Sequence, residues 1–356
     1  MDAYVALSPE SFAFITGVRV PSHSIMRWRH AAAVVDHRGL DSILVVDMEY
    51  TTVSAALPDT AISVWREFFD DPMIELATIL KSRFGDNPQA RVGIELDFIP
   101  TQCMDRLTKQ LPGVAWLPVD SDIETARISK SPEQTGIIQR LTRAADASLT
   151  KAISEVRVGD TEYQIGRKII TNLYDIGVSE HRSLIVASGP RSQYPNVGPS
   201  DRQVEPGDIL RVEVFASDHG YNGAVARTVV LGEPTPDVVK NWNYLSVARN
   251  EALARLRPGA DPREVYRAYV DAMGPLAEYA IAFFGHGLGL GVHERPYVSA
   301  SSEDEILEGA TIGVEPFAMI PGSYGLQMKD VVQITSEGYH MLSDLMDGGQ
   351  LVSVEI

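Results

Sequence analysis

The stretch FFGHGLGLGVHERP, residues 283–296, carries two histidines and a glutamate among four glycines. Histidine is the commonest metal ligand, and it is also the side chain that changes its charge near neutral pH. Glycine lets the backbone approach another group closely. The stretch therefore fits three kinds of structure: half of a metal site, an acid–base site without metal, or a glycine-rich turn.

Two well-known motifs do not fit this stretch. A dinucleotide-binding turn needs a helix that opens at its last glycine, but Pro296 follows too soon for such a helix. A zincin motif, HExxH, needs a second histidine after His293 and Glu294, where Arg295 and Pro296 stand instead.

The composition limits the class of protein. A chain of 356 residues is longer than a single core usually supports, so two domains are expected. Its net charge of −17 and the lack of a Lys/Arg run argue against nucleic acid or an anionic membrane as partner. No apolar run approaches the roughly 20 residues of a membrane helix, and no signal peptide is apparent. With Cys103 as the single cysteine, a reducing cytoplasm is the expected location.

Residues 1–125 are predicted to form a smaller α/β domain. Strand-like and helix-like segments alternate there, which is typical of that class. The predicted strands are YVALS (4–8), FAFITGV (12–18), HAAAVVD (30–36), SILVVDME (42–49), RVGIELD (91–97) and VAWLPVD (114–120), and the predicted helices are MIELATILKSRF (73–84) and TQCMDRLTKQL (101–111).

Residues 126–356 are predicted to form an α+β domain. Ser131, Pro132 and Gln134 form a helix start, with a cap, a first-turn proline and a capping-box partner. Gly177 is expected to end the next helix. Two further helices are predicted at 236–256 and 262–273, and strands at LIVAS (184–188), DILRVEVFA (208–216), AVARTVVLG (224–232), ATIGVEPFAMI (310–320) and LQMKDVVQIT (326–335).

Three charged residues stand inside these apolar strands: Glu213, Glu315 and Lys329. Each alone could be an edge charge that faces water, or part of a salt bridge such as Arg211–Glu213. Together with the histidines they favour a buried polar site. A protonated lysine beside two carboxylates would supply the positive charge that a metal would otherwise supply. The residues therefore indicate a charged site without metal.

The order of these motifs resembles the pita-bread family of methionine aminopeptidase, aminopeptidase P, prolidase and creatinase. The resemblance covers nearly the whole chain and rests on SGPRSQYPN (188–196), GDILRVEVFASDHGYNGAVART (207–228), GHGLGLGVHERP (285–296), LEGATIGVEPFAMIPG (307–322) and GLQMKDVVQIT (325–335). It implies a C-terminal pita-bread fold after a creatinase-type N-terminal domain. The glycines around His286 are then expected to bring backbone close to the substrate.

The metal-dependent members of that family hold two ions with two aspartates, one histidine and two glutamates. The resemblance places these ligands on Glu213, Ala224, His286, Glu315 and Lys329. Alanine cannot bind a metal and a protonated lysine repels one, so no metal and no cofactor are expected. This implies a member without a working metal site, closest in type to creatinase.

Two departures weaken the likeness to creatinase activity itself. Its catalytic histidine falls on Asn196, and its substrate-binding glutamate falls on Ala226. The predicted catalytic residues are therefore His286, His293, Glu315 and Lys329, with the histidines and Glu315 moving protons. Glu213, Glu294, Tyr221, Asn196 and Arg29 are predicted to bind the substrate.

The expected function is metal-independent hydrolysis of a C–N bond, of amide or amidine type, in a small polar molecule. The same residues would also serve a lyase or isomerase. Two other hypotheses stay open: a prolidase-like metallopeptidase and a non-catalytic peptide-binding module. Two-domain relatives commonly form homodimers, in which Arg29 of one chain would reach a substrate carboxylate in the other. A solvated basic loop is the alternative for Arg29.

Overall fold

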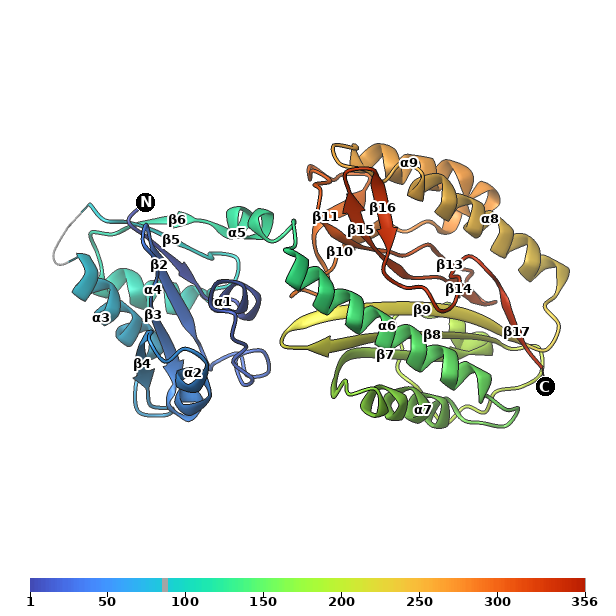
Figure 1. Cartoon of the computed structure of the whole chain (residues 1–356), viewed down its shortest axis with the longest axis horizontal. Helices are drawn as coiled ribbons and strands as arrows, with labels where there is room; N and C mark the ends of the chain where they lie inside the picture. Colours follow the sequence, from blue (N-terminus) through green and yellow to red (C-terminus); the bar gives the residue numbers. More distant parts are fainter. Residues whose placement is uncertain (85–88, 356) are drawn as a thin grey trace. The chain divides into compact units, whose positions relative to one another are not determined.

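The computed structural model describes residues 1–84 and 89–355. The chain forms two compact units, Met1–Ala126 and Arg127–Ile356, which are described separately (Figure 1). Among the described helices, none combines the length and the apolar character that a membrane crossing requires.

The N-terminal unit is an α/β domain around one mixed sheet with the strand order β4-β3-β2-β1-β5-β6. Strand β1 pairs antiparallel with β2 and parallel with β5. The strands are β1 (Ala3–Ala6), β2 (Ala32–Asp36), β3 (Gly39–Val46), β4 (Ala61–Trp65), β5 (Arg91–Ile94) and β6 (Ala115–Pro118), and the helices are α1 (Pro9–Thr16), η1 (Asp47–Glu49), α2 (Tyr50–Ala56), α3 (Pro72–Phe84), α4 (Thr101–Gln110) and α5 (Asp120–Ala126).

Helices cover both faces of this sheet. Val5 and Leu44 pack in one core with α3 and α4, whereas Ala6 and Ile43 pack in a second core with α1 and α2. Because successive residues of a strand face opposite sides, burial of both faces makes the central strands apolar throughout. The predicted α/β class is confirmed for this unit.

The predicted strand FAFITGV is wrong, because its residues belong to helix α1. The Ser8 side chain accepts a hydrogen bond from the N–H of Ser11 (3.1 Å), and Pro9 occupies the first turn. Gly17, with φ 70°, ends the helix in the left-handed conformation. These capping residues favour a helix more strongly than the β-branched and aromatic side chains favour a strand.

The C-terminal unit contains two sheets and a separate hairpin. The strand orders are β17-β9-β8-β7 and β11-β10-β12-β15-β16, and β13 pairs with β14. The strands are β7 (Glu180–Ser188), β8 (Ile209–Asp218), β9 (Tyr221–Leu231), β10 (Phe283–Gly287), β11 (Glu294–Ser299), β12 (Thr311–Val314), β13 (Phe317–Met319), β14 (Gly325–Gln327), β15 (Asp330–Thr335), β16 (Gly338–Met341) and β17 (Val352–Val354).

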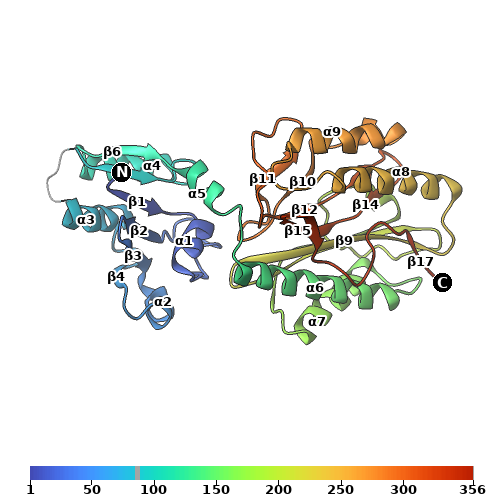
Figure 2. The same ribbon diagram turned by 45° about the horizontal axis from the view of Figure 1, so that its top comes forward.

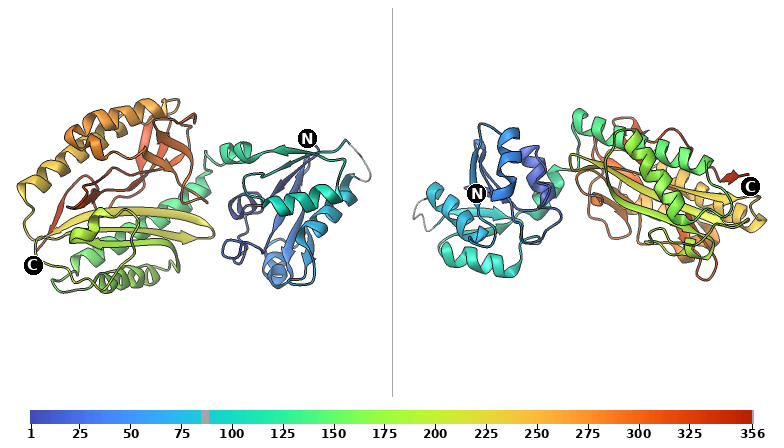
Figure 3. Two further views of the ribbon diagram at one scale, coloured as in Figure 1. Left: turned by 180° about the vertical axis from the view of Figure 1, so that it is seen from behind. Right: turned by 90° about the horizontal axis from the view of Figure 1, so that it is seen from below.

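Helices lie on the outside of both sheets, as the views in Figures 1, 2 and 3 agree. Apolar residues of α6 and α7 pack on β7, β8 and β9, and those of α8 and α9 pack on β10, β12 and β15. The helices are α6 (Pro132–Ser154), α7 (Glu162–Asp175), α8 (Pro236–Leu253) and α9 (Pro262–Ala272), with the short 3₁₀ helices η2 (Gly189–Gln193) and η3 (Gly274–Tyr279).

The predicted helix start at Ser131 and the predicted helix end at Gly177 are confirmed, whereas the helix predicted at 236–256 ends at Leu253. The Ser131 hydroxyl accepts from the N–H of Gln134 (3.3 Å), and the Gln134 side chain accepts from the N–H of Ser131 (2.8 Å). Helix α7 ends before Gly177, whose φ is 90°.

The two long C-terminal strands of the prediction are each interrupted. Glu315 and Pro316 separate β12 from β13, and Met328 and Lys329 separate β14 from β15. At the second break the Lys329 N–H donates to the carbonyl of Ala226 in β9 (3.0 Å). Glu315 and Lys329 therefore stand where the chain passes between sheet partners, whereas Glu213 lies inside the continuous strand β8.

Candidate active site

A cavity of about 450 Å³ is lined by residues of both sheets of the C-terminal unit. Pockets that bind small molecules span about 300–1,000 Å³, so this cavity has room for a small ligand. Its polar and charged lining includes five of the predicted residues, Asn196, Glu213, His293, Glu315 and Lys329. Apolar side chains such as Phe283 and Phe317 form other parts of the wall.

Lys329 joins the two carboxylates. Its Nζ donates to Glu213 Oε1 (3.0 Å) and to Glu315 Oε2 (2.8 Å), and it lies 4.3 Å from the centre of the Phe215 ring. Burial alone would lower the pKa of Lys329, but Glu213 and Glu315 outweigh it and raise that pKa above its usual value. Lys329 is therefore a buried cation at neutral pH.

Gln327 completes the hydrogen bonding of both carboxylates. Its Nε2 donates to Glu213 Oε2 (3.1 Å) and to Glu315 Oε1 (2.5 Å), and its Oε1 accepts from Arg211 Nη1 (2.5 Å). Burial by itself would raise the pKa of Glu315, but Lys329 and His286 hold that pKa below its usual range. All four carboxylate oxygens of the pair thus accept a hydrogen bond.

The two histidines stack on each other. The ring centres of His286 and His293 are 3.5 Å apart, with 13° between the planes. Nδ1 of His286 lies 2.9 Å from the carbonyl oxygen of Gly287, which can only accept, so Nδ1 carries a hydrogen. In the neutral ring Nε2 is then unprotonated. It lies 3.5 Å from Glu315 Oε2.

His293 lines the cavity, whereas His286 lies fully buried behind it. His293 is exposed to solvent at the cavity, and partial desolvation there, followed by the charges of His286 and Lys329, lowers its pKa to about 4. His293 is therefore neutral at neutral pH and has a lone pair that can accept a proton.

Glu294 and Tyr221, two predicted substrate-binding residues, do not line this cavity. Glu294 is buried and accepts from Lys130 Nζ (2.7 Å) and from the N–H of Gly291 (2.9 Å). Tyr221 packs beside Phe215, and burial raises the pKa of its phenol. Both side chains therefore make contacts inside the C-terminal unit and not at the cavity.

Of the two remaining predicted residues, Asn196 lines the cavity beside Pro195. Arg29 belongs to the N-terminal unit, where its guanidinium donates to both carboxylate oxygens of Glu67 (2.9 and 2.8 Å). Such a bidentate pair holds Arg29 in place.

Arg211 and Gln327 are polar residues of the site that the sequence prediction lacks. Arg211 stands two positions before Glu213 in the apolar strand β8, and Gln327 stands two positions before Lys329. Residues two apart in an extended chain face the same side. That spacing is the signal in the sequence, but it does not distinguish a direct Arg211–Glu213 pair from the bridge through Gln327.

None of the glycines of 285–291 is among the residues that line the cavity, and their expected role in bringing backbone close to a substrate stays a prediction. A Cβ atom at Gly287 would lie 2.3 Å from the carbonyl oxygen of Arg295, and one at Gly289 would lie 2.4 Å from Glu294 Oε1. These glycines let the chain at the end of β10 pack closely against β11 and against the carboxylate of Glu294.

Comparisons with known proteins agree with this architecture. Residues 136–336 match Metallopeptidase family M24, and residues 1–129 match the Creatinase/Prolidase N-terminal domain. The chain therefore belongs to the M24 family, with the pita-bread fold predicted from its motifs.

Several relatives within the family are described as dipeptidases. The chain is 29% identical to the probable dipeptidase PepE of Mycobacterium tuberculosis over 268 residues, 71% of each protein. It is 30% identical to the Xaa-Pro dipeptidase of Pyrococcus horikoshii over 256 residues, which cover 71% of this chain and 72% of the relative.

Solved structures share the fold of this chain. The prolidase of Thermococcus sibiricus superposes with a TM-score of 0.88 at 22% identity, over 99% of this chain and 95% of the prolidase. PepE of Mycobacterium ulcerans superposes with a TM-score of 0.84 at 26% identity, over 100% of this chain and 94% of PepE. In type the chain thus resembles prolidase and PepE rather than creatinase, which corrects the expectation from the sequence.

The residues of this site do not fit the two-ion centre that the family resemblance implies. The position of one ligand is Ala224, which is fully buried and has no donor atom. The position of another is Lys329, whose ammonium already neutralises Glu213 and Glu315. A pair of divalent cations would have to displace this ammonium and the hydrogen bonds of Gln327.

Proposed function

We propose that the protein hydrolyses an amide-type C–N bond in a small peptide-like substrate, with the Lys329 ammonium in the place of metal ions. One observation carries this proposal: Lys329 lies between Glu213 and Glu315 at a cavity that His293 also lines. The dipeptidase relatives support the class of reaction. Metal independence is supported by the charges and hydrogen bonds of the site alone.

His293 is the residue proposed to move the proton. Its neutral ring accepts a proton from water as the water oxygen bonds to the substrate carbonyl carbon. The same proton is then given to the leaving nitrogen as the C–N bond breaks, so the products are an acid and an amine. General acid–base catalysis of this kind contributes about 10²–10⁴-fold.

Lys329 and Glu315 have electrostatic roles in this scheme. Lys329 stabilises the negative charge that develops on the carbonyl oxygen, because its ammonium lies in the cavity wall. The Glu315 charge favours the protonated form of His293 while it carries the transferred proton. His286, between His293 and Glu315, holds the ring of His293 in place by stacking.

The cavity favours a substrate of about dipeptide size with an apolar portion. Its volume is about 450 Å³, and Phe283 and Phe317 provide apolar wall. Asn196 provides a neutral donor and acceptor in the same wall. A short peptide, with an apolar side chain and polar amide groups, has this combination.

Turnover of dipeptides in the presence of a chelator tests the proposal. The purified full chain is assayed on a panel of Xaa-Pro and other dipeptides with EDTA, and its metal content is measured. We expect turnover to persist in EDTA and to be lost in Lys329→Met, whereas Lys151→Met, at an exposed position of α6, behaves as wild type. Two bound ions per chain, or activity that EDTA abolishes and Mn²⁺ restores, would refute metal independence.

A peptidase with a single bound ion is the second candidate. Ligand atoms of His286, His293 and Glu315 lie within 4.8 Å of one another, and two histidines with one glutamate form a known catalytic zinc set. Lys329, 2.8 Å from Glu315, opposes it. One tightly bound ion per chain, absent from His293→Ala, would favour this candidate over the first.

The expected homodimer stays a prediction. Light scattering of the purified chain measures its mass in solution. If a dimer is found, Arg29→Gln tests whether the arginine reaches a substrate, since a rise in KM without loss of the dimer is the expected result.

A further inference from the structure

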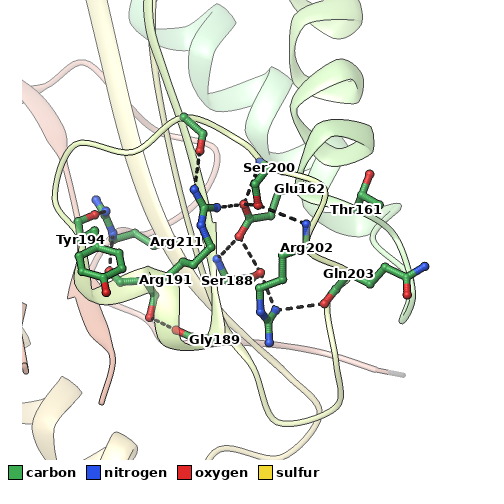
Figure 4. Close-up of polar contacts among 12 residues, drawn as sticks. Thr161, Glu162, Ser188, Gly189, Arg191, Tyr194, Ser200, Arg202, Gln203 and Arg211 are labelled. Carbon is green, nitrogen blue, oxygen red and sulfur yellow. Dashed lines mark hydrogen bonds and ion pairs between the residues drawn. The ribbon is translucent and has the colours of Figure 1, made fainter. Parts of the chain in front are cut away.

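A second buried carboxylate, Glu162, lies outside the cavity and is fully hydrogen-bonded. Its oxygens accept from the N–H and the hydroxyl of Ser188 (2.7 and 2.8 Å), from the N–H and the hydroxyl of Ser200 (3.0 and 2.7 Å), and from Arg191 (Figure 4). A carboxylate has about four lone-pair sites, so these five donors saturate it. Glu162 also begins helix α7, where the helix dipole favours a negative charge.

These donors come from both ends of one segment. Ser188 ends strand β7, Arg191 lies in η2, and Ser200 closes the segment that follows. Arg202 adds a second set of contacts at the same place. Its Nη1 donates to the Ser188 hydroxyl (2.7 Å; Figure 4) and also to Asp208 (2.5 Å). One carboxylate therefore fixes both ends of segment 189–200.

The fixed segment forms part of the cavity wall and holds Arg211. Pro195 and Asn196 line the cavity. The guanidinium of Arg211 donates to the carbonyls of Ser192 (3.1 Å), Tyr194 and Pro195 (3.0 Å). The position of the segment thus determines where this buried guanidinium lies.

Arg211 is connected by hydrogen bonds to the two carboxylates of the site. Its Nη1 donates to Gln327 Oε1 (2.5 Å), and the amide nitrogen of Gln327 donates to Glu213 and Glu315. When the amide oxygen of Gln327 accepts from Arg211, its amide nitrogen points away from Arg211, toward the carboxylates. Arg211 therefore fixes which end of Gln327 faces the carboxylates.

The same segment is tied to the strand that carries Gln327. The Ser192 hydroxyl accepts from the N–H of Gly325 (3.1 Å), and the Gln193 side chain accepts from the N–H of Gly322 (2.6 Å). Two independent routes, one through Arg211 and one through these backbone bonds, connect segment 189–200 to Gln327.

We propose that Glu162 is a positioning residue for the active site: through segment 189–200 and Arg211 it sets the orientation of Gln327 and of the two carboxylates. This inference rests on the proposed function for its kinetic test, because it assigns a role at that same site. Glu162 does not line the cavity, so it acts on the substrate only through other residues.

The test compares Glu162→Gln with Glu95→Gln. Glu95 is a matched control in the N-terminal unit: it is buried and accepts from two backbone N–H groups and two hydroxyls, of Leu7, Ser8 and Ser11. We expect both variants to melt at lower temperature. On the best dipeptide of the panel, Glu162→Gln should lower kcat by roughly 10- to 100-fold with a smaller change in KM, and Glu95→Gln should change neither.

Hydrogen exchange gives a measurement that does not depend on turnover. In Glu162→Gln we expect faster amide exchange both in 189–200 and in 325–329, and Glu95→Gln should leave both segments as in wild type. Unchanged kcat and KM, or faster exchange in 189–200 alone, would overturn the positioning role. If wild type cleaves no dipeptide, the proposed function fails and the exchange result still decides this inference. If Glu162→Gln does not fold, Arg191→Gln, which removes one of the five donors, takes its place, with Arg191→Lys expected to restore kcat in part.

Discussion

Lys329 and Asp330 are neighbours in the chain, and each is the centre of a buried cluster of charges. Lys329 lies between Glu213 and Glu315 in the wall of the cavity. Asp330 lies between two arginines and does not line the cavity. Successive residues of an extended chain point to opposite sides, so one short stretch supplies both clusters.

The Asp330 cluster is enclosed by the fold. Asp330 pairs with Arg227 (3.0 Å) and Arg249 (2.6 Å) and accepts from the Ser343 hydroxyl (2.8 Å). Burial would raise the pKa of Asp330, but the two arginines hold that pKa below its usual range. Arg227 also donates to the carbonyl of Met346 (2.7 Å), which ties the C-terminal residues to the sheet.

A buried charge cluster is not by itself a sign of catalysis. Both clusters pair their charges and shift the pKa of a carboxyl group in the same direction. Only the Lys329 cluster has a cavity beside it and a neutral histidine in the same wall. The Lys329 cluster thus differs from the Asp330 cluster in two respects: it has space for a ligand, and it has a group able to accept a proton.

The largest expected effect follows from breaking the enclosed cluster. Asp330→Asn leaves Arg227 and Arg249 without their shared carboxylate, so we expect a loss of about 3–5 kcal/mol in the free energy of unfolding. Urea denaturation measures it. Since the pKa of Asp330 is lowered in the folded state, this stability is present above the ordinary aspartate pKa of about 3.9 and is lost as pH falls below it. A loss under about 1 kcal/mol at neutral pH would contradict the enclosed character of the cluster.

Breaking the cavity cluster should affect catalysis more than stability. Lys329→Met removes the cation, and we expect kcat to fall about 10²–10³-fold. The free energy of unfolding should fall by only about 1–3 kcal/mol, because Glu213 and Glu315 line the cavity and can be hydrated there. If Lys329→Met lost as much stability as Asp330→Asn and kept its activity, the catalytic role of the Lys329 cluster would be contradicted.

His293 provides a smaller effect that depends on pH. The pKa of His293 is lowered from 6.5 to about 4, so the unfolded chain binds more protons between these values and stability declines as pH falls through that window. His293→Asn should therefore lose less stability than wild type between pH 6.5 and pH 4, while it loses turnover at pH 7. Denaturation curves across that range measure it, and identical pH dependence in the two proteins would argue against the lowered pKa.

The smallest effect is expected at the surface, which sets the baseline for the clusters. Glu251, in the last turn of α8, pairs with Arg255 just beyond the end of that helix (2.9 Å), and both side chains are about half exposed. Glu251→Gln should change the free energy of unfolding by under about 0.5 kcal/mol, since water and salt screen such a pair. The same urea titration provides the number, and a loss near that of Asp330→Asn would show that the assay does not separate buried from exposed pairs.

Several features could be predicted from local sequence because local chemistry determines them. Ser131 with Gln134 determines a helix start, and Gly177 determines a helix end. The order of the spaced motifs predicts the pita-bread family, and the match to Metallopeptidase family M24 confirms it. The segment FAFITGV shows the limit of this approach, because its side chains favour a strand while Ser8 and Gly17 at its two ends favour a helix.

The fold family can be predicted from the sequence alone, as can the presence of unusual charges in apolar segments, such as Glu213, Glu315 and Lys329. Their partners depend on tertiary packing, because Lys329 is more than 100 positions from Glu213 and no local pattern indicates that they meet. Tertiary packing also pairs Glu294 with Lys130 away from the cavity. It places Gln327 between Arg211 and the two carboxylates. The physical reason is that a buried charge is stable only beside its partner, and the packing of two sheets, rather than the neighbouring residues, brings that partner within reach.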